Sequence, residues 1–581
     1  MLANKLYLKY AAIGLVQGLV FITLLFFEPT TLLFAAVKHG VYYASLFMLL
    51  SYILILPKKL TVTQIRQVVI IGLLMGGLAT WLYTQQYPTP GYQSRSGVIL
   101  FAWSLLAVLL AYIVLPFIQS QSLFKRRSID YSALYRHSWD NFFVLSLAGL
   151  FMLIYWLMIV LSIFLFEMLA INQVKDFLLS PSFLLLTMPI MFSIGVRIGH
   201  EHERVISTIR FIALSICRFL LPLSAFISVI FAITLLFTGL EPLWETGVST
   251  HALLWLIVVN LVFINGVYQD GSNTVNYPLA IKVLVNLALI ALVLFAFISV
   301  YSVYLRIDQY GLTPKRIYIM IISGVAALYT VTYAWAAISS FRSKLGNHWL
   351  EQIKTPNVVI AYLVAGLIII MHSPFMDVYN LSARNQFNRV LDPATDLERF
   401  DFGVLNYRLG NPGLEYLARL DTGLEDGSLA LDEARSKKMK QQLALLSKSK
   451  GYYQWKNYLR EGNQLRKKHR VTSIDPEKTI PEELTRAFDL YYCRDGVCEV
   501  LFVDLTRNGQ DEAIILNRPT SWGRSRIYAL QDDKSWKHVA DLKHRGTDVA
   551  KAIHEGRFLV TEPAYKTLVI KGKELQIELV R

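Results

Sequence analysis

The stretch NVVIAYLVAGLIIIMHSPFMDVYNLSARNQFNRV, residues 357–390, decides the fold of this chain. Its first part is apolar and ends at Met371. Pro374 then ends the helix, because proline lacks an N–H and clashes with the preceding turn. Polar side chains follow at once. The stretch therefore marks a boundary between a part of the chain that suits lipid and a part that suits water.

The composition supports this division. The 581 residues are 54% hydrophobic and only 17% charged, with a mean hydropathy of +0.42, which is typical of membrane proteins. Of the 99 Lys, Arg, Asp and Glu residues, 63 lie after residue 380. We attribute the net charge of +15 to basic cytoplasmic loops rather than to nucleic-acid binding, for which the sequence contains no motif.

Apolar runs long enough to cross a bilayer recur through residues 1–373. Each run must be helical, because an open backbone cannot be satisfied in lipid. The expected fold is a polytopic α-helical membrane bundle of about 11 spans, followed by a soluble α+β domain with an antiparallel β meander. We place the spans at 8–27, 34–56, 67–84, 97–119, 142–166, 182–199, 211–240, 252–268, 279–304, 317–339 and 357–373.

The same shift in composition predicts the domain boundaries. They are a transmembrane helical bundle at 1–373, a junction at 374–390, a mainly helical soluble segment at 391–480 and a β-rich extracytoplasmic domain at 481–581. Within the tail, helices are predicted at 414–420, 429–450 and 481–488. Strands are predicted at 489–494, 497–504, 512–517, 525–530 and 535–542, and in pieces within 557–579.

Basic residues in the loops predict the orientation. Loops 57–66, 120–141 and 197–210 are rich in Lys and Arg, and the loops between them are poor in both. The N-terminus is therefore expected in the cytoplasm, and an odd number of spans places the tail outside it. In this orientation loop 305–316, which has three basic residues, would lie outside the cytoplasm, contrary to the charge rule. Either the weak span 252–268 does not cross fully, or this loop has its own reason to be basic.

Two cysteines give a second indication for the tail. In DLYYCRDGVCEVLFV, residues 489–503, Asp495-Gly496 is a strong two-residue hairpin turn. This turn places Cys493 opposite Cys498, at a separation that suits a disulfide. The alternative is two unpaired thiols on one face of a sheet. A disulfide needs an oxidising compartment, so the pattern favours an extracytoplasmic tail.

The segment 504–512 resembles a short calcium loop. Oxygen ligands at alternate positions can surround a hard cation, and Gly509 permits a sharp turn. The alternative, which we favour, is a hairpin turn with Asn508-Gly509 at its tip. The candidate ligands are Asp504, Thr506, Asn508, Asp511 and Glu512. Calcium is the single cofactor that the sequence suggests.

Polar residues inside the apolar runs are costly and often line the interior of a bundle. They are Lys38, His39, Asn260, Asn265 and Lys282. A polar path for a substrate or ion is one interpretation. Snorkelling lysines and hydrogen bonds between helices are the other. His200-Glu-His-Glu-Arg204 is interpreted as a polar helix end, since two histidines two residues apart point to nearly opposite sides of a helix.

The loop QYGLTPKR (309–316) and the junction HSPFMDVYNLSARNQFNRV (372–390) resemble those of the domain-of-unknown-function-4153 family of bacterial membrane proteins. The resemblance covers roughly residues 130–420. It implies a polytopic inner-membrane protein and supplies no activity and no catalytic residues. We expect the two stretches to meet and to dock the tail onto the bundle. The residues concerned are Tyr310, Gly311, Thr313, Arg316, His372, Asp377, Arg384 and Gln386.

Three functions remain open. The leading one is a non-enzymatic multi-pass protein of the bacterial cytoplasmic membrane, which anchors an extracytoplasmic domain that binds a small ligand or an envelope protein. The second is a transporter or permease with a polar path through the bundle. The third is a membrane enzyme acting on envelope substrates, with Asp308, His372 or Asp377 at the membrane face. No catalytic residue is assigned, because no acid–base pair is visible in the sequence.

Overall fold

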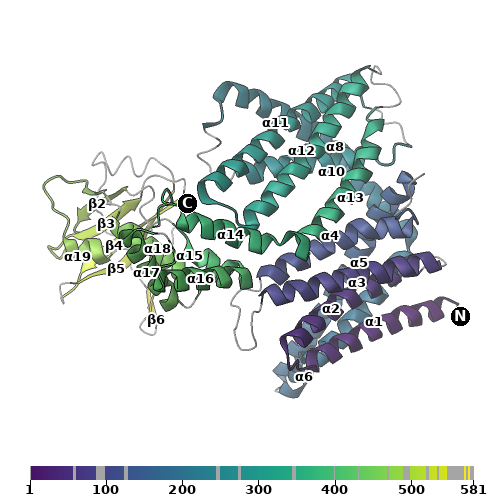
Figure 1. The fold of residues 1–581 in the computed structure, drawn as a ribbon, viewed down its shortest axis with the longest axis horizontal. Helices are drawn as coiled ribbons and strands as arrows, with labels where there is room; N and C mark the ends of the chain where they lie inside the picture. The colour runs from purple at the N-terminus through teal and green to yellow at the C-terminus, as the bar shows by residue number, and fades with distance from the viewer. Residues whose placement is uncertain are drawn as a thin grey trace. The chain divides into compact units, whose positions relative to one another are not determined.

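Eleven helices in the described part of the chain are long and apolar enough to cross a membrane, which confirms the predicted bundle (Figure 1). They are α1 (Leu2–Phe26), α2 (Leu32–Ile55), α3 (Val62–Gln86), α4 (Val98–Gln119), α5 (Tyr131–Met168), α7 (Pro181–Glu201), α8 (Glu203–Thr238), α10 (Ser249–Tyr268), α11 (Leu279–Tyr310), α12 (Pro314–Arg342) and α13 (Lys354–Met371). The predicted weak span 252–268 is a helix, α10, which is long and apolar enough to cross a membrane.

The structure is a computed structural model. It describes all residues except 1, 57–59, 87–97, 124–128, 170, 242, 244–248, 273–276, 343–348, 398–399, 430, 450, 467–469, 488–496, 518–521, 533–534, 546–567, 571–572 and 576–581. The chain divides into two compact units, Met1–Tyr452 and Tyr453–Arg581. The first unit thus extends beyond the predicted bundle and junction, and takes in much of the segment that the sequence assigned to a separate soluble part.

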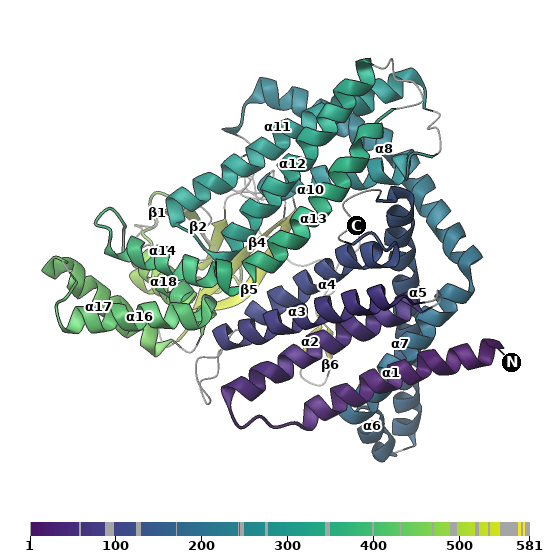
Figure 2. The same ribbon diagram turned by 45° about the vertical axis from the view of Figure 1, so that its right-hand side comes forward.

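Small residues let the membrane helices approach closely. A Cβ added to Gly14 of α1 would lie 2.6 Å from Ile190 Cα in α7. One added to Gly76 of α3 would lie 2.7 Å from the carbonyl oxygen of Gly40 in α2. This is the usual packing mode in lipid, where burial of apolar surface does not itself drive helices together. Figure 2 shows α1, α2 and α3 running side by side, and α10 to α13 doing the same.

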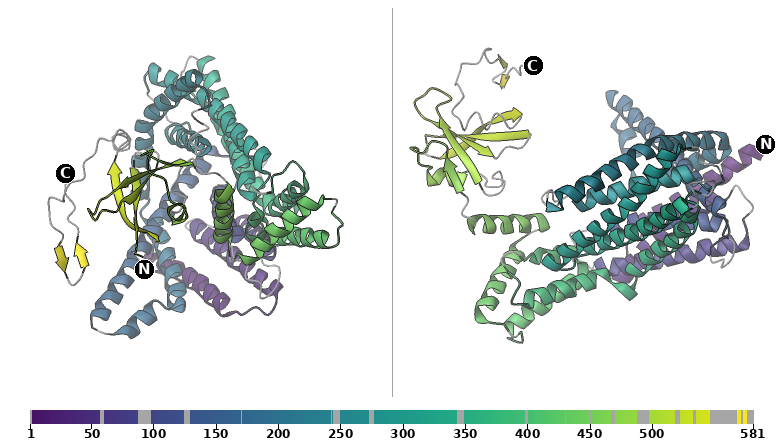
Figure 3. Two further views of the ribbon diagram at one scale, coloured as in Figure 1. Left: turned by 90° about the vertical axis from the view of Figure 1, so that its left-hand side faces the viewer. Right: turned by 90° about the horizontal axis from the view of Figure 1, so that it is seen from above.

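Short helices cover one end of the bundle within the first unit. They are α14 (Val378–Leu391), α15 (Phe402–Arg408), α16 (Gly410–Glu425) and α17 (Glu433–Lys448). Helix α14 contacts α12 and α16, and α16 also contacts α3. Arg435 of α17 donates to the carbonyls of Val390 and Asp392 at the end of α14, at 2.7 and 2.6 Å. Figure 3 shows these helices at one end of the long ones, with α1 beginning at the other end.

The remaining short elements of the first unit are α6 (Asn172–Leu178) and two 3-10 turns, η1 (Glu351–Ile353) and η2 (Pro374–Met376). The second unit contains α18 (Tyr452–Arg466), α19 (Glu482–Ala487) and the strands β1 (Arg470–Ser473), β2 (Val497–Val503), β3 (Glu512–Asn517), β4 (Trp522–Leu530), β5 (Trp536–Arg545), β6 (Leu568–Ile570) and β7 (Lys573–Leu575).

The second unit is built on a five-stranded sheet of order β1-β2-β3-β4-β5, and β6 and β7 form a separate pair. Strands β2 to β5 form the predicted antiparallel meander. Strand β1, which the sequence analysis missed, runs parallel to β2. Alternate residues of β2 and β3 enter two apolar clusters on the two faces of the sheet. Val500 and Ile515 belong to one cluster, and Leu501 and Ile514 to the other.

Candidate functional site

The YGLTP loop is held by two amide side chains of α14. Asn385 Oδ1 accepts a hydrogen bond from Leu312 N at 2.7 Å. Gln386 Nε2 donates to the carbonyls of Tyr310 and Leu312, at 3.1 and 2.8 Å. The loop is short and irregular, so α14 supplies partners for three of its backbone groups, which are Leu312 N and the carbonyls of Tyr310 and Leu312. The predicted meeting of loop and junction is confirmed, and we call it the α14 contact: residues 308–313 with Asn385, Gln386 and Arg389.

Two guanidinium groups cover the carboxyl end of α11. Arg389 donates to the carbonyls of Asp308 and Gln309, at 3.1 and 2.7 Å. Arg316 donates to the carbonyls of Tyr310 and Gly311, at 3.0 and 2.7 Å. The last carbonyls of a helix have no partner within it and carry partial negative charge, which cations satisfy. Arg316 therefore has a structural role as a cap at the end of α11.

Gly311 is required by both conformation and space. Its φ is +73°, where side chains with a Cβ are strained. A Cβ there would also lie 2.7 Å from both Asn385 Oδ1 and Gln386 Nε2. A larger residue at this position would push α14 away from the loop.

His372 lies at the start of the junction, and 2% of its surface is exposed. Its Nε2 is 3.0 Å from the Tyr318 hydroxyl and its Nδ1 is 2.8 Å from the Ile368 carbonyl. The Trp103 ring is 5.4 Å away. Burial lowers the pKa of His372 below its ordinary value of 6.5, and the hydrogen bond to Ile368 opposes this only in part. The neutral imidazole thus joins α4, α12 and α13.

The other predicted junction residues have local tasks. Asp377 accepts from the N–H groups of Tyr379 and Asn380 and so caps α14. Thr313 accepts from Arg316 N in the same way at the start of α12. Arg384 lies on the exposed face of α14. The sequence predicts that Arg384 docks the tail, but Asn385 and Arg389 do so instead, together with Gln386. The spacing 385, 386 and 389 on one helix face was the signal for the docking side.

The polar residues within the spans are placed apart from one another. Lys38 Nζ donates to the Phe27 carbonyl at 3.0 Å, and the His39 ring stacks on Tyr83 at 4.2 Å. In another part of the bundle, Lys282 Nζ lies 5.9 Å from the centre of the Trp349 ring. These lysines and this histidine do not line one path among the described residues.

The two asparagines also have partners within the bundle. Asn260 donates to Ser228 Oγ at 3.0 Å. Asn265 donates to the Tyr333 hydroxyl at 2.8 Å and accepts from Asn357 Nδ2 at 2.7 Å. These bonds join α10 to α8, α12 and α13, so both asparagines connect helices within the bundle.

The candidate calcium loop is closed by its own hydrogen bonds. Asp504 accepts from the N–H groups of Asn508 and Gly509, at 3.1 and 2.8 Å. Glu512 accepts from Leu505 N at 2.7 Å and from Thr506 Oγ1 at 2.9 Å. Asp511 forms an ion pair with Lys478. Among the described residues no group of three or more His, Cys, Asp or Glu side chains could hold a metal ion. The turn is explained without calcium.

The predicted cysteine hairpin lies only partly within the described residues. The neighbours of Cys498 in the sheet are Val471 of β1 and Asn517 of β3. The predicted partner strand 489–494 lies outside the described residues. Cys493 itself lies outside the described residues.

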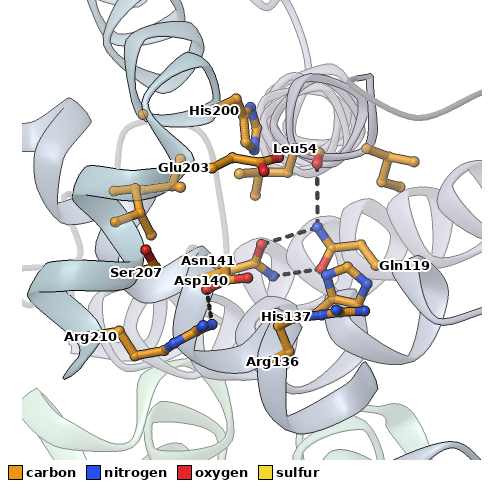
Figure 4. Close-up of a pocket in the computed structure, with 14 residues that line it drawn as sticks. Leu54, Gln119, Arg136, His137, Asp140, Asn141, His200, Glu203, Ser207 and Arg210 are labelled. Atoms are coloured by element: carbon orange, nitrogen blue, oxygen red, sulfur yellow. Dashed lines mark hydrogen bonds and ion pairs between the residues drawn. The ribbon is translucent and has the colours of Figure 1, made fainter. Parts of the chain in front are cut away.

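A polar cavity of about 420 Å³ lies between the ends of α2, α4, α5, α7 and α8 (Figure 4). Its charged and polar lining includes Gln119, Arg136, His137, Asp140, Asn141, His200, Glu203, Ser207 and Arg210. The size is within the range of small-molecule sites. The sequence pattern of residues 200–204 indicates a polar helix end and no cavity, because the cavity walls come from five separate helices.

Two hydrogen-bonded pairs of side chains form part of the cavity wall. Arg210 of α8 donates to Asp140 of α5 at 2.5 Å. Gln119 and Asn141 exchange amide hydrogen bonds at 3.0 and 2.8 Å. Figure 4 shows Glu203 on the side of the cavity nearest His200, away from the pair formed by Arg210 and Asp140.

The cavity and the α14 contact lie at opposite ends of α4. Gln119, the last residue of α4, lines the cavity. Near its other end, the Trp103 ring lies beside His372. A Cβ on Gly410 of α16 would be 2.9 Å from Ile99 Cδ1. Since α4 has 22 residues, the two ends are about 33 Å apart, close to the thickness of a bilayer core.

Comparison with known proteins identifies a family for this chain. No curated protein and no solved structure matches this chain. Residues 44–420 match the family described as domain of unknown function, DUF4153. The match includes the α14 contact and every residue that lines the cavity. Because it spans more than half of the chain, this multi-pass membrane protein belongs to the DUF4153 family.

Proposed function

We propose that this protein is a membrane anchor of the cell envelope, which holds its carboxyl-terminal sheet domain outside the cytoplasm to bind a partner protein or a small ligand. The observation that carries the proposal is the α14 contact. Three side chains of α14 satisfy four carbonyls and one N–H of residues 308–312. Such a contact fixes the segment that follows the last span of the bundle.

The loop charges support this orientation. Arg66, Arg136, Arg197 and Arg204 gather at the cavity end of the bundle, which we place in the cytoplasm. The one basic loop at the other end contains Arg316, and this arginine caps α11. A residue with that task does not report on orientation, so Arg316 drops out of the count, and Arg306 and Lys315 remain as the basic residues of this loop.

An outside location also implies oxidised cysteines. We keep a Cys493–Cys498 disulfide as part of the proposal, because two cysteines five residues apart in a domain outside the cytoplasm meet an oxidising environment. Mass spectrometry of the intact protein, alkylated with and without prior reduction, measures it. Alkylation of both thiols without reduction would remove this part of the proposal.

Cysteine labelling in whole cells tests the orientation. In a chain whose three native cysteines are replaced by alanine, Ser447→Cys is placed on the exposed face of α17 and Thr208→Cys on the exposed face of α8. A membrane-impermeant maleimide should label Ser447→Cys in intact cells, and Thr208→Cys only after lysis. The reverse pattern would overturn the proposal.

Partner binding needs a separate experiment. Full-length protein carrying a photo-crosslinking residue at exposed Val539 of β5 should give an adduct with an envelope component in living cells. The same residue at Phe219, which is exposed on a membrane-spanning face of α8, is the matched control and should crosslink to lipid. If Val539 gives no adduct while the protein is folded, the sheet domain has no bound partner under those conditions and this part of the proposal fails.

A transport path is less well supported. The polar residues that suggested it are engaged with local partners at separate places in the bundle. The polar cavity near one membrane face points instead to a binding site.

A further inference from the structure

We propose that the cavity between α2, α4, α5, α7 and α8 binds the zwitterionic headgroup of a phospholipid, with its phosphate towards Arg136 and Arg210 and its amine towards Glu203. This inference is independent of the proposed anchoring function. It rests on the charges of the cavity, on its level in the membrane and on the apolar surface beside it.

The lining carries both signs of charge, and α5 and α8 each contribute one arginine and one carboxylate. Arg136 and Asp140 come from α5, and Glu203 and Arg210 come from α8. Asp140 is already bonded to Arg210, so Glu203 is the carboxylate that remains for a cationic group. Figure 4 shows Glu203 across the cavity from the Arg210–Asp140 pair. A ligand with one anionic and one cationic end matches this arrangement better than a simple anion does.

Arginine suits the phosphate end. Its guanidinium is weakly hydrated and presents several N–H donors in a plane, which fits the oxygens of a phosphodiester. The bond from Arg210 to Asp140 uses one of these donors and holds the side chain at the cavity wall. His137 lines the same side of the cavity.

The cavity lies where a headgroup would be. Its walls are formed at the ends of membrane-spanning helices, with α7 ending at Glu201 and α8 beginning at Glu203. One break at His202, with φ −101° and ψ 52°, separates the two helices. Residues at such helix ends face the interfacial region of a bilayer.

Apolar surface continues from the cavity into the membrane. Directly after Arg210, α8 exposes Phe211, Ile212, Ile216 and Phe219, and 71% and 81% of the two phenylalanines are exposed. Next to Asn141, α5 exposes Phe142. Such surfaces have lipid as their natural partner. A molecule with a polar headgroup in the cavity would therefore find apolar surface for its acyl chains, which a free phosphate or a soluble amine would not use.

Native mass spectrometry of the full-length protein in detergent tests the proposal. The probes are phosphatidylethanolamine, phosphatidylglycerol and soluble glycerophosphoethanolamine. The expected result is that the protein retains phosphatidylethanolamine about tenfold better than phosphatidylglycerol, since one charge-assisted contact distinguishes them. Soluble glycerophosphoethanolamine should bind much more weakly than the lipid. Equal retention of the two lipids would overturn the proposal, and equal affinity for the soluble compound would show that lipid is not the ligand.

Two exposed side chains of the cavity allow variants that should still fold. Glu203→Gln should remove the preference for phosphatidylethanolamine, and Arg136→Gln should weaken retention of both lipids. The matched controls are Glu241→Gln, an exposed carboxylate beyond the other end of α8, and Arg204→Gln, an exposed arginine beside the cavity residues. Both controls should bind as the unchanged protein does. If the controls lose as much binding as the cavity variants, the effect is one of surface charge and the cavity is not the site.

Discussion

The two ends of the bundle are built in opposite ways. At the α14 contact, amide and guanidinium groups meet backbone carbonyls, and His372 is enclosed. At the cavity, charged groups from α5 and α8 face an open volume of about 420 Å³, with side chains of Asp140 and Arg210 that are a third and a quarter exposed. The first arrangement resists change because the bonds of Asn385 and Gln386 are partly buried, and their loss leaves backbone groups without a partner. The second leaves charges accessible to a ligand.

The largest effect is expected at the loop of the α14 contact. Gly311→Val should destabilise the protein by more than the about 1–3 kcal/mol of backbone strain alone, because its side chain would also displace Asn385 and Gln386. Thermal unfolding of the purified protein in detergent measures this. Gly324→Ala in α12 is the control, since a Cβ there meets nothing within 4 Å. If the two variants unfold at the same temperature, the α14 contact does not stabilise the fold.

A smaller loss is expected on α14 itself. Arg389→Leu removes two hydrogen bonds to the end of α11 and should cost about 1–2 kcal/mol, after allowance for partial exposure. Limited proteolysis between α13 and α17 should become faster. Arg384→Leu alters an exposed arginine on the same helix and should have almost no effect. Similar losses in both variants would point to a general charge effect on α14.

The cavity end should tolerate change better. Replacing both members of the Arg210–Asp140 pair, by Arg210→Gln and Asp140→Asn, should alter the free energy of unfolding by about 0–1 kcal/mol, because the pair is partly exposed. A double-mutant cycle isolates the coupling energy of the pair. A coupling energy larger than the loss of stability in Arg389→Leu would contradict the contrast between the two ends of the bundle.

The smallest effect near neutral pH is expected from His372, and it concerns the pH dependence of the unfolding temperature. Its pKa in the folded protein lies below 6.5, so the folded state binds fewer protons than the unfolded state between that pKa and 6.5. The contribution of the neutral imidazole is complete above pH 6.5 and is lost as the pH falls through the lowered pKa. The unfolding temperature should therefore drop on acidification, and by less in His372→Gln. An identical pH dependence in both proteins would show that His372 does not couple to folding.

Several features followed directly from the sequence, for reasons of local chemistry. Apolar runs of about 20 residues define spans because an unpaired backbone is too costly in lipid, and all eleven are helices in the structure. Turn residues and alternation also predicted 512–517, which is β3 to the residue. In each case the signal lies within one short segment.

Features that depend on segments far apart in the chain were harder to predict from the sequence. Strand β1 was missed because its four residues carry little signal and its partner β2 begins at Val497. Among the described residues Cys498 pairs with Val471 of β1 and Asn517 of β3, and the predicted partner strand 489–494 lies outside them. Arg384 and Arg389 look equivalent in the sequence, yet only the face of α14 that meets α11 decides which of them docks.

The sequence by itself determined that the chain crosses the membrane and where the last span ends. It did so because bilayer thickness, proline and turn chemistry act on neighbouring residues. The tertiary structure alone decided which side chains of α14 satisfy the end of α11, and that the ends of five helices enclose a charged cavity. Both depend on how helices far apart in the chain are packed, and no local pattern of residues specifies that packing.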